Sequence, residues 1–158
     1  MDKTLVAYFS CSGVTEKLAK TLASVTGGDL YRIEPAVPYT NADLNWRDPK
    51  ARSTVEMQDK KSRPAITGKI QNMNNYNVVY IGFPIWWYIA PTIINTFLES
   101  YDFSGKVVIP FATSGSSGIG ETDRWLHNSC SKETKWRPAK RFGNEDDKAL
   151  KTWVDGLD

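Results

Sequence analysis

Residues 4–23 read TLVAYFSCSGVTEKLAKTLA, and this stretch decides the fold. It begins with an unbroken apolar run from Leu5 to Phe9, which is typical of a β-strand buried on both faces of a sheet. Six small or turn-tolerant residues follow at 10–15, with one glycine among them. Apolar residues then recur at helical spacing, which predicts an amphipathic helix that carries Val14, Leu18, Leu22 and Val25 on one stripe.

The order strand, hydroxyl-rich turn, helix N-terminus predicts an anion site. The first turn of a helix presents free backbone N–H groups and the positive end of the helix dipole to whatever lies in front of it. We therefore expect this turn to bind an anion such as a phosphate group. The candidate residues are Ser10, Cys11, Ser12, Gly13, Val14 and Thr15.

The rest of the chain alternates β-prone and helical segments. Further strands are expected at 29–34, 77–83, 105–112 and, at an edge, 136–142. Further helices are expected at 49–60, 91–100, 121–130 and 145–157. The alternation predicts right-handed βαβ units and an α/β fold, a three-layer αβα sandwich in one domain spanning residues 1–158. Pro110 cannot donate to a sheet ladder, so we expect a bulge or one-sided pairing there.

Composition excludes several classes of function. The formal net charge of +2 gives no support for nucleic-acid binding, which needs a strongly basic face. Two cysteines and one histidine do not suggest a disulfide framework or a metal site. No apolar stretch is long enough to span a membrane, and no signal peptide is visible, so we expect a cytoplasmic protein without membrane contact.

Three loops that follow expected strands have unusual compositions, at 10–15, 84–90 and 113–118. Ligands of parallel α/β sheets bind outside the carboxyl ends of the strands, which is where these loops lie. The first loop suits a phosphate, the second is aromatic, and the third is rich in backbone amides and hydroxyls. Together they predict a ligand with a phosphate, a flat ring and polar ring edges. By composition alone, the adjacent tryptophans could equally form the roof of a core.

Other phosphate-binding motifs each lack a residue that their chemistry needs. A Walker loop requires a lysine after its last glycine, but Val14 follows Gly13. A dinucleotide fingerprint requires three spaced glycines, although Glu34 could mimic its ribose-binding acid. A cysteine phosphatase would carry an arginine where Lys17 stands, and a phosphoryl-accepting regulator would carry acids where Ser10 stands.

Three motifs resemble the loops of the flavodoxin-like family, in particular its short bacterial branch. They are YFSCSGVT at 8–15, GFPIWW at 82–87 and PFATSGSSG at 110–118, and PYT at 38–40 and DL at 43–44 recur in that branch as well. The resemblance covers nearly the whole chain. It implies a five-stranded parallel sheet of order 2-1-3-4-5 that binds FMN non-covalently.

The resemblance also implies a role for each loop in FMN binding. The first loop would hold the phosphate through hydroxyls and backbone N–H groups, from Ser10 through Cys11, Ser12, Gly13 and Val14 to Thr15. The second would flank the isoalloxazine ring with Pro84, Ile85, Trp86, Trp87 and Tyr88. The third would meet the pyrimidine edge and the ribityl chain with Thr113, Ser114, Gly115, Ser116 and Gly118. No side chain need act as a catalytic acid or base.

The chain departs from the resemblance to single-electron flavodoxins in two ways. Those proteins are strongly acidic, which steers them to basic partners, whereas this chain has a net charge of +2. They also usually carry a glycine in the loop after the third strand, and residues 84–91 contain none. A non-glycine peptide resists positive φ, so we expect little one-electron-reduced flavin and a preference for two-electron chemistry.

Three functions remain open. The leading hypothesis is an FMN-dependent oxidoreductase that passes electrons from NAD(P)H to a quinone-like acceptor. The second is a one-electron-transfer flavodoxin that serves a protein redox partner, and the third is a non-catalytic flavin- or nucleotide-binding protein. Paired subunits sharing a flavin site are common among related reductases, so a homodimer is compatible with the aromatic surface.

Two smaller expectations concern the surroundings of the site. Cys11 lies near a helix N-terminus, where a thiol pKa can fall, so a redox role is one interpretation. The other is that its backbone N–H serves the phosphate and its small side chain only fills space. Tyr39, Trp46 and Arg47 lie in a long irregular segment and could form a flap over the ring.

Overall fold

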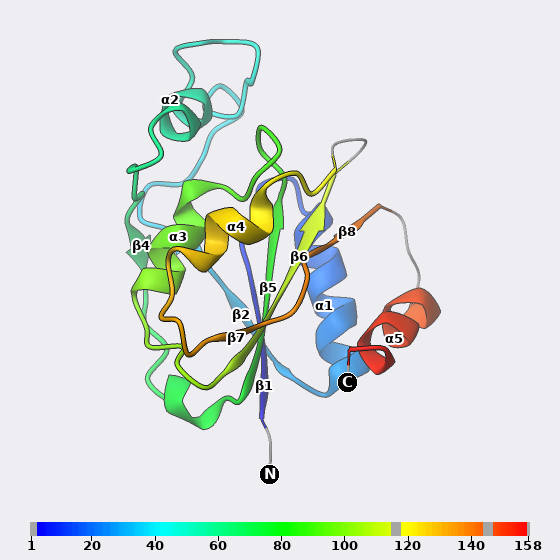
Figure 1. Ribbon diagram of the computed structural model, residues 1–158. Helices are drawn as coiled ribbons and strands as arrows, with labels where there is room; N and C mark the ends of the chain where they lie inside the picture. The colour runs from blue at the N-terminus through cyan, green and yellow to red at the C-terminus, as the bar shows by residue number, and fades with distance from the viewer. Residues whose placement is uncertain (1–2, 115–117, 144–146, 158) are drawn as a thin grey trace.

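The structure, a computed structural model, describes residues 3–114, 118–143 and 147–157. It contains a parallel sheet between two layers of helices (Figure 1), as the sequence predicts. The strands follow the order β2-β1-β5-β6-β7, and β8 also pairs with β6. Their bounds are β1 (Thr4–Tyr8), β2 (Asp29–Arg32), β5 (Val78–Pro84), β6 (Val107–Thr113), β7 (Lys135–Trp136) and β8 (Lys140–Phe142).

The edge of the sheet differs from the prediction because the expected strand at 136–142 is divided in two. β7 pairs with Val107 and Val108, and β8 pairs with 111–113, so the edge is interrupted opposite Pro110. On its other side β6 stays paired with β5 through Ile81 and Pro110. The one-sided pairing expected at Pro110 is therefore confirmed, and Pro138 stands in the gap between β7 and β8. With β7 and β8 taken as one interrupted strand, the order is the predicted 2-1-3-4-5.

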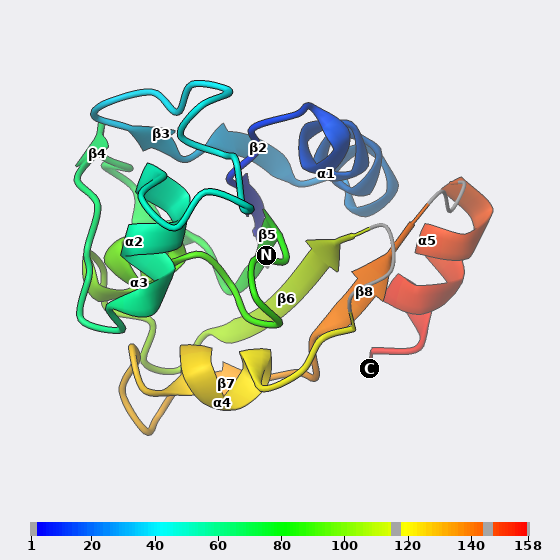
Figure 2. The ribbon, with the colours of Figure 1, turned by 90° about the horizontal axis from the view of Figure 1, so that it is seen from above.

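Helices cover both faces of the sheet (Figure 2). α1 (Val14–Thr26) and α5 (Asp147–Asp155) lie on one face, and α3 (Thr92–Glu99) and α4 (Thr122–His127) lie on the other. β1 serves both cores because its side chains alternate: Leu5, Ala7 and Phe9 join the core under α3, and Val6 and Tyr8 join the core under α1. None of the helices in the described part of the chain is long and apolar enough to cross a membrane.

Helix α1 confirms most of the predicted stripe. Leu18 and Leu22 are buried, and the helix ends at Gly27, which adopts the left-handed conformation with φ of 71°. Val14, however, is 53% exposed, so its predicted inward position is wrong. The buried stripe includes Thr15 instead, which places Val14 at the margin of the helix face that meets the sheet.

The stretch at 36–65 rises above the carboxyl edge of the sheet (Figure 1). A second small sheet, which the sequence did not predict, pairs β3 (Glu34–Pro35) with β4 (Ile66–Thr67) in antiparallel fashion. Between them α2 (Arg52–Gln58) is shorter than the expected helix at 49–60. Its start is delayed because Asp48 closes a turn, accepting the N–H of Lys50 at 2.9 Å on its side chain. A 3-10 turn, η1 (Met73–Asn75), precedes β5.

An ion pair connects the end of α3 to the chain before β4. Arg63 donates from Nε and Nη2 to the two carboxylate oxygens of Glu99, at 2.9 and 3.0 Å. Ser129 Oγ donates to the same carboxylate at 2.9 Å. The hydrogen bonds from Arg63 hold the pKa of Glu99 below its ordinary value.

We expect Glu99→Gln to lower the free energy of unfolding near pH 7 by no more than about 1 kcal/mol, because the pair is exposed. A carboxylate whose folded pKa is depressed stabilises the fold above its unfolded pKa. That contribution disappears as the pH falls through the folded pKa. Urea unfolding at about pH 7 and about pH 2 measures the difference. A deficit of equal size at both pH values would contradict the assignment.

Candidate functional site

A pocket of about 620 Å³ opens at the carboxyl edge of the sheet. Its volume lies within the range of ~300–1,000 Å³ typical of small-molecule sites. Three segments far apart in the sequence form its wall. The lining residues are Cys11, Ser12 and Thr15; Leu44, Trp46 and Ser53; and Pro84, Ile85, Trp86, Trp87 and Tyr88. The pocket therefore brings together the first two predicted loops and adds a third wall, of which only Trp46 was expected from the sequence.

The first loop has the geometry of an anion site. Gly13 caps α1 with φ of 91°, and Lys17 N–H donates to Gly13 O at 3.0 Å as the first hydrogen bond of the helix. The N–H groups of residues 14–16 precede that bond and have no acceptor within the helix. Ser10 Oγ accepts the N–H of Gly13 at 3.2 Å and so shapes the turn. Ser12 precedes these N–H groups in the chain and is exposed. The side chain of Val14 is exposed as well.

The first and third loops are linked at their bases. The hydroxyls of Thr15 and Thr113 are 2.7 Å apart and both are buried. Ser114 accepts hydrogen bonds from Arg141 of β8, to its Oγ at 2.9 Å and to its carbonyl at 3.0 Å. Gly118 is exposed at the far end of this loop. Two residues of the third loop that were predicted to bind the cofactor, Gly115 and Ser116, lie outside the described residues.

The aromatic loop is a tight two-residue turn. Trp86 and Ile89 exchange both backbone hydrogen bonds, at 3.0 and 3.2 Å. Trp87 and Tyr88 between them have φ of 50° and 68°, which corresponds to a type I′ turn. The expectation that a loop without glycine avoids positive φ is therefore wrong. The argument for two-electron chemistry from the missing glycine loses its premise, and strained backbone of this kind is typical of functional sites.

This turn gives a direct test of the strain. We expect Tyr88→Gly to be more stable than Tyr88→Ala by about 1 kcal/mol, because only glycine adopts the left-handed conformation without steric cost. Both variants lose the same exposed ring, so their difference isolates the backbone. Chemical denaturation of the two proteins measures it. Equal stabilities would mean that the turn relaxes out of positive φ once the ring is gone.

The third wall belongs to the segment that carries α2. Arg52 packs over the ring of Tyr39, with its guanidinium carbon 3.8 Å from the ring centroid, and pairs with Glu56 at 3.0 Å. Tyr39 donates its hydroxyl to Glu56 and packs edge-on against Phe9 and Trp86. This arrangement holds the segment against the aromatic loop.

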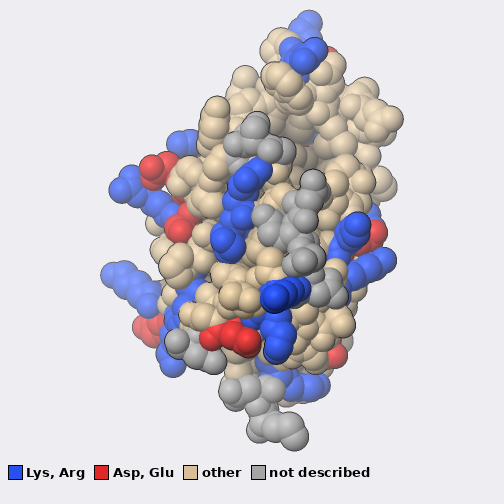
Figure 3. All heavy atoms as spheres, turned by 90° about the vertical axis from the view of Figure 1, so that its right-hand side faces the viewer, with Lys and Arg blue, Asp and Glu red and all other residues tan. Residues whose placement is uncertain are grey.

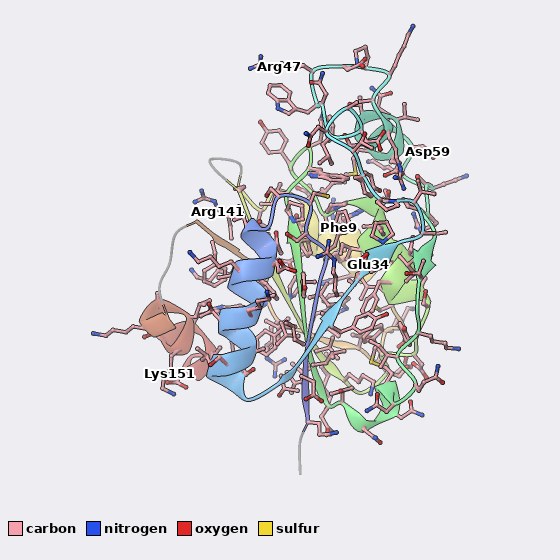
Figure 4. All side chains as sticks on the ribbon, turned by 180° about the vertical axis from the view of Figure 1, so that it is seen from behind. Phe9, Glu34, Arg47, Asp59, Arg141 and Lys151 are labelled. Carbon is pink, nitrogen blue, oxygen red and sulfur yellow. The ribbon has the colours of Figure 1, made fainter. Side chains whose placement is uncertain are left out.

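Of the three residues expected to form a flap, Tyr39, Trp46 and Arg47, only one lines the pocket. Trp46 lines the pocket and is largely exposed, and Arg47 stacks on it 5.0 Å from the ring centroid, at the far tip of the molecule (Figure 4). Tyr39 lies behind the wall, against Trp86, rather than in the pocket. Only Trp46 of the three is therefore positioned to contact a ligand directly.

The Cys11 thiol does not have the lowered pKa that its position suggested. Desolvation by the surrounding wall raises the pKa of Cys11 to about 11, and this outweighs the opposing influence of Arg32 and Arg52. The thiol is therefore protonated near neutral pH and is a poor nucleophile. Among the described residues, no group of three or more His, Cys, Asp and Glu side chains is placed to hold a metal ion.

Three residues near the pocket escaped sequence patterns. Arg141 reaches the third loop from β8, and Ser53 reaches the pocket from α2. A Cβ on Gly120 would lie 2.4 Å from the carbonyl oxygen of Tyr88, so that glycine lets the chain after the third loop lie against the aromatic turn. A glycine just beyond the third loop is the signal that could have pointed to Gly120. Ser53 and Arg141 carried no local signal.

Two solved structures resemble this chain over nearly its whole length. A candidate flavoprotein from Bacteroides eggerthii DSM 20697 is 48% identical, with a TM-score of 0.94, covering 99% of this chain and 98% of that one. A candidate flavoprotein from Bacteroides uniformis ATCC 8492 is also 48% identical, with a TM-score of 0.92 and 98% of each chain covered.

A more distant structure is a flavoprotein in complex with FMN from Lactobacillus acidophilus NCFM. It is 23% identical with a TM-score of 0.70, covering 98% of this chain and 99% of that one, and shares the fold. No curated protein matches the chain. The family described as Flavodoxin matches residues 3–157. This match spans nearly the whole chain, and the chain belongs to the flavodoxin family.

Proposed function

We propose that this protein binds FMN and acts as an oxidoreductase on a small planar acceptor such as a quinone, with NAD(P)H as the electron donor. The observation that carries the proposal is the pocket itself, which joins free N–H groups at the start of α1 to an aromatic turn. The complex of the Lactobacillus acidophilus flavoprotein with FMN supports the choice of cofactor.

The described residues fit the chemical groups of FMN. The N–H groups of residues 14–16 and the hydroxyl of Ser12 suit a phosphate, since both are donors at the positive end of a helix dipole. Trp86, Trp87 and Tyr88 offer aromatic faces and edges to a planar ring. FMN would supply the redox chemistry, and the chain would supply its position and electrostatic surroundings.

The charge distribution favours a small acceptor over a basic protein partner. The net charge is +2, and the face over α5 and β8 carries Lys and Arg side chains spread among smaller acidic groups (Figure 3). A strongly acidic surface, which steers single-electron carriers to their partners, would have the opposite sign. The aromatic pocket wall contains no charged residue, which suits an uncharged substrate.

A one-electron carrier that serves a protein partner is the second candidate. Trp87 and Tyr88 favour it, because they are 42% and 65% exposed beside the pocket and aromatic residues are enriched at protein interfaces. The positive φ values of these two residues also remove one objection to it. The charge balance disfavours it.

Spectra and turnover separate these functions. We expect the purified protein to be yellow, to release FMN on denaturation, and to oxidise NADH or NADPH rapidly only when menadione is added. A protein that binds FMN, does not react with either nucleotide and accumulates one-electron-reduced flavin on photoreduction would support the second candidate. A protein that stays colourless after incubation with FMN would overturn both.

A further inference from the structure

Ser53 combines two properties that no other residue of the pocket shares. Among the described residues, five buried side-chain polar atoms have no hydrogen-bond partner, and Ser53 Oγ is the only one that belongs to a pocket-lining residue. The residue is 2% exposed. Leaving a buried hydroxyl without a hydrogen-bond partner is unfavourable. An unpaired hydroxyl on a residue that lines a pocket therefore points to a ligand that forms the missing hydrogen bond.

The backbone of Ser53 is held in place while its hydroxyl is not. Its N–H donates to Asp43 O at 2.9 Å, and the neighbouring Arg52 is fixed by its ion pair with Glu56 and by the ring of Tyr39. Oγ makes no hydrogen bond to any described residue, so rotation about χ1 breaks none. The side chain can therefore turn its hydroxyl between staggered positions toward a molecule in the pocket.

The pocket wall restricts the chemistry of that molecule. No lining residue is charged, and the nearby Arg52 and Glu56 are paired with each other. On the side away from the turn at 10–15, the lining includes four aromatic residues, Trp46, Trp86, Trp87 and Tyr88. Aromatic walls without charge favour a flat, uncharged molecule, and the Ser53 hydroxyl adds a hydrogen bond at its edge.

We propose that Ser53 determines substrate specificity by donating a hydrogen bond to a carbonyl oxygen of a neutral planar acceptor, a quinone. The acceptor lies between residues 43–57 and the aromatic loop at 84–88. This inference rests on the proposed function and names the residue that recognises the carbonyl group of the substrate. A quinone oxygen can only accept a hydrogen bond, and the serine hydroxyl supplies the donor.

Thr54 is the matched control. It follows Ser53 on α2, is 5% exposed and also has no partner for its hydroxyl among the described residues, but it does not line the pocket. Ser53→Ala and Thr54→Val each remove an unpartnered buried hydroxyl. Neither is expected to lower the melting temperature, so the two variants can be compared as folded proteins.

The test measures binding to the oxidised, FMN-loaded protein without an electron donor. Quenching of tryptophan fluorescence reports the dissociation constants of menadione and of 2-methylnaphthalene, which has a similar shape but no carbonyl. Ser53→Ala is expected to weaken menadione binding by about five- to tenfold and to leave 2-methylnaphthalene unchanged. Thr54→Val is expected to change neither.

Three results would overturn the inference: equal menadione affinity in wild type and Ser53→Ala, equal weakening of both probes, or a loss confined to FMN affinity. The last would assign Ser53 to the cofactor. Turnover is scored separately. If the wild type reduces menadione but Ser53→Ala binds it as tightly as the wild type and Thr54→Val do, the proposed function stands and this inference fails. If menadione binds through Ser53 without turnover, the reverse holds.

Discussion

Gly82→Ala is expected to lower the free energy of unfolding by about 3 kcal/mol, at the upper end of the usual cost of overpacking a core. A Cβ at position 82 would lie 2.2 Å from Cζ and 2.3 Å from Cε2 of Phe111 on the adjacent strand. Phe111 is fully buried, and β5 and β6 pair on both sides of the contact, so neither the ring nor the backbone can withdraw cheaply.

A second substitution tests the cause of this loss. In a Gly82→Ala background, Phe111→Leu should recover part of the stability, whereas in the wild type it should only destabilise, giving a coupling free energy of about 1 kcal/mol or more. Gly156→Ala is the matched control, because its Cβ would meet neighbours at ordinary distances of 3.5 and 3.6 Å. Additive effects of the two core substitutions would show that the contact with Phe111 is not what requires glycine.

The Gly82–Phe111 contact shows which features of the fold could be predicted from the sequence and which could not. Apolar runs such as 5–9 and 77–83 specify buried strands through composition, and parallel order follows from their alternation with helices. Those predictions needed only local pattern. The fit of Phe111 over Gly82 depends on the register between two strands, which no residue near either position encodes.

The same distinction applies to the site. The turn at 10–15 and the helix start behind it were predictable because they belong to one continuous segment. Of the third wall, Trp46 was anticipated as part of a flap, but Ser53 was not, since it reaches the pocket only through the way α2 rests on Tyr39. The positive φ of Trp87 was also hidden, because the paired backbone of residues 86–89 overrides the preference of a bulky side chain.

The largest functional effect is expected at Ser12. Ser12→Asp should weaken FMN binding on the order of a thousand-fold, because the new carboxylate competes with the phosphate for the same N–H groups and repels it. Two unit charges about 4 Å apart at an effective dielectric constant near 20 repel by about 4 kcal/mol, which corresponds to that factor. Ser12 is exposed, and a carboxylate beside the N-terminus of α1 interacts favourably with the helix dipole, so the variant should fold normally.

Riboflavin separates this electrostatic effect from a general loss of the site. It has the same ring as FMN but no phosphate, so Ser12→Asp should change its affinity only slightly. Ser12→Asn has nearly the same shape as the aspartate without its charge and should retain most of the affinity for FMN. Flavin fluorescence titrations at low and high salt measure all three proteins, and the deficit of Ser12→Asp should shrink as salt screens the repulsion. An equal loss of FMN and riboflavin binding would place the phosphate elsewhere than at the start of α1.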